Sequence, residues 1–116
     1  MRDLLLQAAG CGAMLVAVLH AVLGERKLFA RAVIEPRSVR RMLRLGWHCG
    51  AVAWACFGLL LVVTPMSEGM DLRRWIIAAA AMTFAFGVVG NAWCTRGRHF
   101  GWVALTAVIA LAIAGL

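Results

Sequence analysis

The stretch LGWHCGAVAWACFGLLLVVT, residues 45–64, contains no Asp, Glu, Lys or Arg. As a helix, these residues would reach across the hydrocarbon core of a bilayer, which is about 30 Å thick. Residues 4–23, 75–95 and 100–116 are also free of these charged residues. Since backbone amides cannot stay unpaired in lipid, each stretch should be helical. The sequence therefore predicts an all-α integral membrane four-helix bundle, with helices at about 4–23, 45–64, 73–95 and 99–116.

The overall composition agrees with a single transmembrane domain over residues 1–116. Hydrophobic residues make up 64% of the chain and charged residues 15%, and the mean hydropathy is +0.88. A soluble domain of this size would carry a much more polar exterior. Asp3 offsets Arg2 at the start of the chain, so the first apolar stretch is interpreted as a helix and not as a cleaved signal peptide.

The basic residues are distributed unevenly between the two sides. Nine lie in the first and third loops: Arg26, Lys27, Arg31, Arg37, Arg40, Arg41, Arg44, Arg96 and Arg98. Only Arg2, Arg73 and Arg74 lie on the other side. The positive-inside rule then predicts cytoplasmic first and third loops and both termini outside the cytoplasm. The net charge of +7 thus reflects topology and does not indicate nucleic acid. The preference for Arg over Lys suggests a bacterial inner membrane.

The first loop, residues 25–44, has an amphipathic pattern. Arg37, Arg40, Arg41 and Arg44 recur at helical spacing and share one face. This spacing predicts a turn or two of helix on the inner leaflet, with its arginines among anionic lipid headgroups. A solvated loop that sets the topology by charge alone is the other interpretation.

A weak internal repeat relates the two halves of the chain. GWHCGAVA (46–53) matches GRHFGWVA (97–104), which aligns His48 with His99. The third loop, around residues 95–98, is so short that the third and fourth helices must be antiparallel neighbours. The repeat suggests two helical hairpins related by a pseudo-twofold axis.

Three histidines fall at one depth, near the cytoplasmic boundary of the bundle. His20 lies one turn before the inner end of the first helix, His48 lies one turn into the second, and His99 begins the fourth. Glu25, Asn91 and Cys94 lie at the same level and are candidates for a supporting shell. Neutral imidazoles bind metal ions and haem iron and can relay protons, so His20, His48 and His99 are the candidate ligands. Histidines that only join helices by hydrogen bonds are the competing interpretation.

Helical phase predicts which faces meet. His20 and His48 share their faces with small residues, so both are expected to point into the bundle. Trp47, Trp54 and Leu61 fall on the far side of the second helix and are expected to face lipid. Gly46 and Gly50 form a GxxxG pattern opposite His48, which could pack against a second copy or a membrane partner.

These features favour a small membrane protein that binds a metal ion or haem, or relays protons, through its histidine layer. The alternative is a non-catalytic membrane subunit or assembly factor that binds a partner through helix faces and its basic loop. A small multidrug-type transporter is disfavoured because no span contains a carboxylate. An enzyme acting on a soluble substrate is disfavoured because there is no extramembrane domain.

Overall fold

The computed structural model describes residues 1–67 and 69–116, and 85% of the chain is helical. It contains α1 (Arg2–Leu23), α2 (Arg37–Val63), α3 (Met70–Thr95) and α4 (Gly101–Ala114). A π-helix, η1 (Gly24–Phe29), continues α1, and a short 3-10 helix, η2 (Thr64–Met66), continues α2. No strand occurs in the described residues, and the predicted all-α four-helix bundle is confirmed.

Three of the helices are long and apolar enough to cross a membrane: Arg2–Phe29, Arg37–Met66 and Met70–Thr95. The fourth is shorter than predicted, because α4 has 14 residues. The turn before it explains the difference. Arg96 and Gly97 both have positive φ, 52° and 73°, and this left-handed turn ends α3. The chain then needs residues 98–100 to reverse direction, so His99 precedes α4 instead of lying within it.

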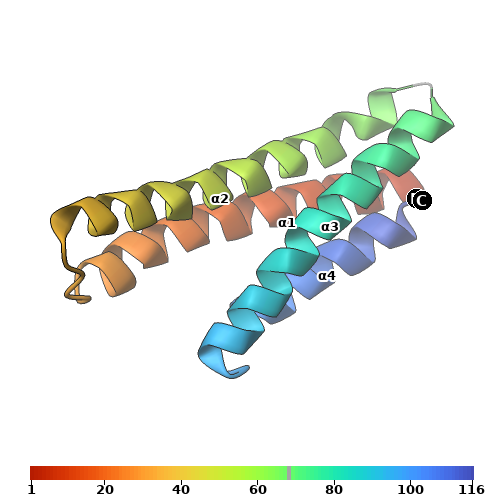
Figure 1. Ribbon diagram of the computed structural model, residues 1–116. Helices are drawn as coiled ribbons and strands as arrows, with labels where there is room; N and C mark the ends of the chain where they lie inside the picture. The colour runs from red at the N-terminus through yellow and green to blue at the C-terminus, as the bar shows by residue number, and fades with distance from the viewer. Residues whose placement is uncertain (68) are drawn as a thin grey trace.

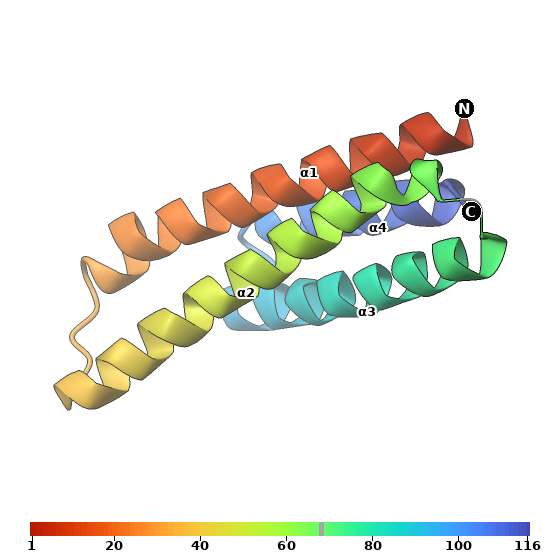
Figure 2. The same ribbon diagram turned by 90° about the horizontal axis from the view of Figure 1, so that it is seen from above.

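The helices form two antiparallel hairpins, α1–α2 and α3–α4 (Figure 1). Both termini lie at one end of the bundle, here called the terminal end (Figures 1 and 2). The α1–α2 connection and the α3–α4 turn lie at the opposite, loop end. The hairpins are close together at the terminal end and diverge toward the loop end (Figure 1). Two pockets lie between the hairpins where they diverge.

The hairpins differ more than the sequence repeat suggests. His48 lies inside α2, which begins at Arg37, whereas His99 lies in the turn before α4. The two histidines that the repeat aligns therefore occupy different structural positions. The expected loop 25–44 also differs, because residues 37–44 are the first two turns of α2 and not a separate interfacial segment.

The core packs small residues of α1 against larger side chains of the other helices. Its buried members are Leu6, Ala9, Ala13, Leu61, Ile77, Ala80, Phe84, Leu105, Val108 and Ala112. At the α1–α2 crossing, a Cβ atom on Gly10 would lie 2.4 Å from the carbonyl oxygen of Gly58. The absence of side chains at these two positions lets the backbones touch, as is common in membrane helix pairs.

This crossing corrects the predicted orientation of α2. Leu61, expected to face lipid, is fully buried, and Trp47 and Trp54 pack against His20. Gly58 is four residues after Trp54 and three before Leu61, so it lies on the same helical face. Contact between Gly58 and Gly10 therefore turns that whole face toward α1.

The terminal end is held by Arg73, near the start of α3. Its guanidinium donates hydrogen bonds to Asp3 Oδ1 at 2.8 Å and to the carbonyl oxygen of Gly115 at 2.7 Å. The side chain is only 15% exposed. One residue thus joins the start of α1, the start of α3 and the end of α4, where the two hairpins meet.

Candidate functional site

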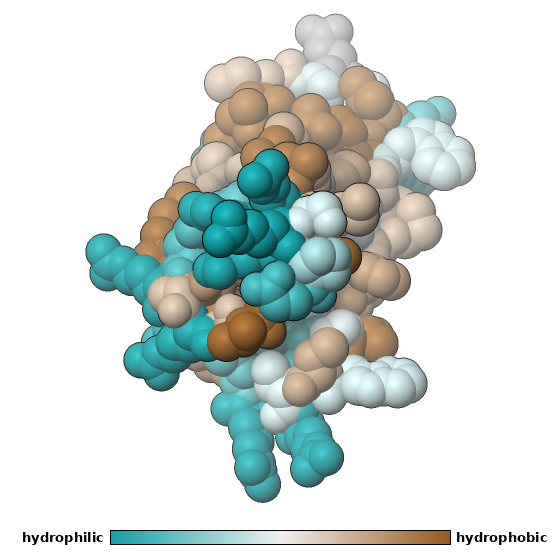
Figure 3. Space-filling view, turned by 60° about the vertical axis from the view of Figure 1, so that its left-hand side comes forward, coloured by the Kyte–Doolittle hydropathy of each residue, from teal (hydrophilic) through white to brown (hydrophobic). Residues whose placement is uncertain are grey.

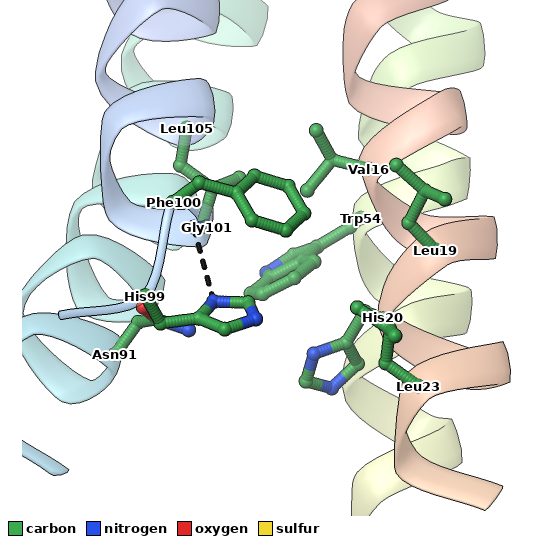
Figure 4. Close-up of a pocket in the computed structure, with 10 residues that line it drawn as sticks. All are labelled: Val16, Leu19, His20, Leu23, Trp54, Asn91, His99, Phe100, Gly101 and Leu105. Atoms are coloured by element: carbon green, nitrogen blue, oxygen red, sulfur yellow. Dashed lines mark hydrogen bonds between the residues drawn. The ribbon is translucent and has the colours of Figure 1, made fainter. Parts of the chain in front are cut away.

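A hollow lies between the two hairpins at the loop end. It consists of three adjoining pockets of about 30, 570 and 530 Å³. His20 and Asn91 line all three pockets, and His99 lines those of about 30 and 530 Å³. The two larger pockets have the volumes of small-molecule sites. Figure 4 shows the smallest pocket, with His20 on one hairpin and His99 and Asn91 on the other.

Two indoles hold His20 at the wall of the hollow. The His20 ring stacks on Trp47 with ring centroids 4.0 Å apart, and Trp54 lies 4.7 Å away at a tilt. Trp47 Nε1 donates a hydrogen bond to the backbone carbonyl of His20 at 2.9 Å. Trp47 can come this close because Gly24 has no side chain; a Cβ there would lie 2.1 Å from Trp47 Nε1. The His20 ring is therefore fixed by its neighbours in α2.

His99 faces the hollow from the α3–α4 turn. Its Nδ1 accepts a hydrogen bond from the backbone N–H of Gly101 at 3.1 Å, which satisfies one of the free amides at the start of α4. A neutral imidazole that accepts at one nitrogen carries its proton on the other. Figure 4 shows this second nitrogen, Nε2, on the side of the hollow that His20 lines. His99 thus offers an N–H donor to the hollow.

Asn91 contributes an unpaired polar atom to the same wall. Its Oδ1 is buried and has no hydrogen-bond partner among the described residues. An orphaned buried acceptor of this kind costs about 1–3 kcal/mol. Cys94, on the next turn of α3, lines the two larger pockets.

His48 lies apart from the hollow, in a charged cluster with Glu25 and Arg44. His48 Nε2 is 2.7 Å from Glu25 Oε1, and Arg44 donates to both carboxylate oxygens at 2.7 and 2.6 Å. Glu25 reaches α2 from the π-helix η1. A separate pocket of about 260 Å³ adjoins Glu25 and His48 but not His20 or His99. The structure therefore divides the predicted histidine layer into two places.

The reason for this division is the rotation of α2. Trp47 takes the inward position beside His20, and the next residue, His48, is turned by about 100° to the outside. Within residues 1–67 and 69–116, no three His, Cys, Asp or Glu side chains come together as a metal site. The set His20, His48 and His99 is thus not assembled around one point.

Gly46 and Gly50 have open space where side chains would be, because no atom lies within 4 Å of a Cβ built at either position. Gly50 lines the pocket of about 570 Å³ between the hairpins. The predicted contact of Gly46 and Gly50 with a second copy or a partner stays a prediction. Trp47 and Trp54 were not predicted as site residues. Trp47 and Trp54 are seven residues apart, so they lie on the same face of α2 as Gly58 and Leu61. This spacing was the sequence signal that could have identified them.

The chain matches no family model, and comparisons with curated proteins and with solved structures give no match either. Its fold defines it as a helical membrane protein with three helices able to span a bilayer.

Proposed function

We propose that this membrane protein binds a lipid-soluble molecule that has a flat ring carrying oxygen atoms, such as a quinone or its quinol. The single observation that carries the proposal is the hydrogen bond from Gly101 N–H to His99 Nδ1, which leaves Nε2 facing an aromatic-lined hollow opposite His20. A ring oxygen of the ligand can accept a hydrogen bond from His99 Nε2. The hollow is predominantly apolar, as lipid-soluble ligands require.

The hydrogen bond of His99 favours such a ligand over a metal ion or haem. A histidine that binds metal through Nε2 must lend the lone pair of that nitrogen, and it then carries its proton on Nδ1. Here Nδ1 accepts from Gly101, so metal binding would require this bond to break. We expect purified protein to show no Soret absorption and no stoichiometric metal. A Soret band lost in both His20→Ala and His99→Ala would instead establish haem binding.

Replacing His99 by alanine should weaken quinone binding about 3- to 10-fold, because one neutral hydrogen bond is lost. The probe is decylubiquinone, added to detergent-purified protein and followed by quenching of tryptophan fluorescence. Trp47 and Trp54 line the hollow, so a bound quinone lies close to both. His48→Ala is the matched control and should change the affinity less than twofold. Equal losses in the two variants would contradict the assignment of the site to the hollow.

We also propose that the loop end lies in the cytoplasm of a bacterial cell and that the protein resides in the inner membrane. The nine basic residues of the first and third loops support this orientation. Both termini lie at the other end of the bundle (Figures 1 and 2), so the proposal places both of them outside the cytoplasm.

Reporter fusions test this orientation directly. A reporter inserted at residue 36 should be active in the cytoplasm, and one fused after Leu116 should be active in the periplasm. The reverse pattern would place the hollow at the periplasmic side and would invert the topology.

A further inference from the structure

The start of α2 extends beyond the hydrocarbon core of a membrane. The helix has 27 residues and is therefore about 40 Å long, compared with about 30 Å of hydrocarbon. The excess of about 10 Å corresponds to two turns. The charged end of α2 is residues 37–44, so these two turns lie at the level of the lipid headgroups. Figure 3 shows hydrophilic side chains gathered at this loop end beside apolar ones.

Contacts with η1 divide the four arginines of these turns into two pairs. Arg40 donates a hydrogen bond to the carbonyl oxygen of Phe29, and Arg44 forms two with the carboxylate of Glu25. Arg40 and Arg44 are one turn apart, so they share the side of α2 that faces η1. This pair stabilises the packing of η1 on α2.

The other pair, Arg37 and Arg41, is free of such contacts. Both residues are exposed, and within residues 1–67 and 69–116 neither has a carboxylate within ion-pair distance. They also lie one turn apart, where like charges repel each other. An anion bound between their guanidinium groups would relieve that repulsion and accept several charge-assisted hydrogen bonds.

An exposed apolar strip continues from this pair into the span. Leu45 follows Arg41 by four residues and is 67% exposed, and Val52 lies two turns further and is 61% exposed. Cys49, between them, is also exposed. These residues share one side of α2 with Arg37 and Arg41. The surface therefore has a cationic head at headgroup depth and an apolar strip directly below it.

We propose that Arg37 and Arg41 bind the phosphate group of an anionic phospholipid, one acyl chain of which lies along Leu45 and Val52. This lipid site is separate from the hollow and does not depend on the ligand proposed for it. The occupant belongs to the leaflet that surrounds the loop end. Arg40 and Arg44 take no part, because their hydrogen bonds to Phe29 and Glu25 hold both side chains against η1.

Native mass spectrometry of the full chain tests the proposal. The protein is equilibrated in detergent with equal amounts of phosphatidylglycerol and phosphatidylcholine that carry the same acyl chains. Wild type should retain phosphatidylglycerol preferentially. R37Q/R41Q should lose about 30-fold of the phosphatidylglycerol affinity, which is the effect of two arginines at about 1 kcal/mol each. R37K/R41K should retain most of it, since the charges remain.

R40Q/R44Q is the matched control, because it also removes two positive charges from the same two turns. It should keep the phosphatidylglycerol preference within about threefold but should lower the unfolding temperature, since η1 loses its anchors. Inorganic phosphate at millimolar concentration should not displace the lipid, because it cannot use the apolar strip. Equal losses of phosphatidylglycerol affinity in R37Q/R41Q and R40Q/R44Q would show that net charge alone causes the preference, and would contradict a site at Arg37 and Arg41. An unchanged preference in R37Q/R41Q would overturn the proposal.

Discussion

Replacing Gly58 by valine should separate α1 from α2 and cost more than about 3 kcal/mol of unfolding free energy. A Cβ atom at this position would lie 2.8 Å from the carbonyl oxygen of Gly10 and 2.9 Å from Met14 Cγ. The side chain of Met14 can move aside, but the backbone of α1 cannot move without shifting the whole hairpin. The measurement is unfolding of the purified protein in mixed micelles, followed by circular dichroism.

Gly46→Val provides the matched control on the same helix. No atom lies within 4 Å of a Cβ built at Gly46, so the same substitution meets no obstacle. It should change the unfolding free energy by no more than about 0.5 kcal/mol. If Gly46→Val destabilised the protein as much as Gly58→Val, the effect would come from the helix itself and not from the α1–α2 crossing.

The class of fold could be predicted because it depends on the distribution of charge along the chain. Four stretches without charged residues define four helices, since lipid permits no other backbone structure for them. The ends of the helices were harder to predict. The arginines at 37–44 looked like a boundary, but charged residues do not end a helix, and α2 runs without a break from Arg37 to Val63.

The rotation of each helix could not be derived from apolar periodicity. Lipid is as apolar as a core, so Leu61 is equally well placed on either side of α2. The orientation is set by close contact between Gly10 and Gly58, at positions on two different helices. Periodicity identifies the face that contains Gly58, but it does not reveal that Gly10 is the partner.

The difference between depth and rotation also explains how much of the candidate site could be predicted. The depth of His20, His48 and His99 follows from counting residues, and all three lie toward the loop end of the structure. Which of them meet depends on rotation. A turn of about 100° separates Trp47 from His48, and it places the indole, not the imidazole, against His20. The π-helix η1, which brings Glu25 to His48, has no sequence signal in the pattern of apolar residues.

Filling the hollow should abolish ligand binding more completely than the loss of any single hydrogen bond. Gly90, on α3, lines the pocket of about 570 Å³, and no atom lies within 4 Å of a Cβ built there. In Gly90→Phe, a phenyl ring would enter this space without displacing the backbone. We expect the affinity for decylubiquinone to fall at least 30-fold. The helix itself should tolerate the change, because phenylalanine favours a helix more than glycine does.

In Gly50→Phe, the phenyl ring would enter the same pocket from the other hairpin, because Gly50 lies on α2. No atom lies within 4 Å of a Cβ built at Gly50. It should block binding as strongly as Gly90→Phe, although the two residues belong to different hairpins. Gly46→Phe is the control, since Gly46 is also open but does not line the pocket. It should bind decylubiquinone as wild type does, and all three variants should unfold at wild-type temperatures. Wild-type affinity in both Gly50→Phe and Gly90→Phe would show that the ligand does not occupy the hollow, because two rings inserted from opposite hairpins leave it no room there.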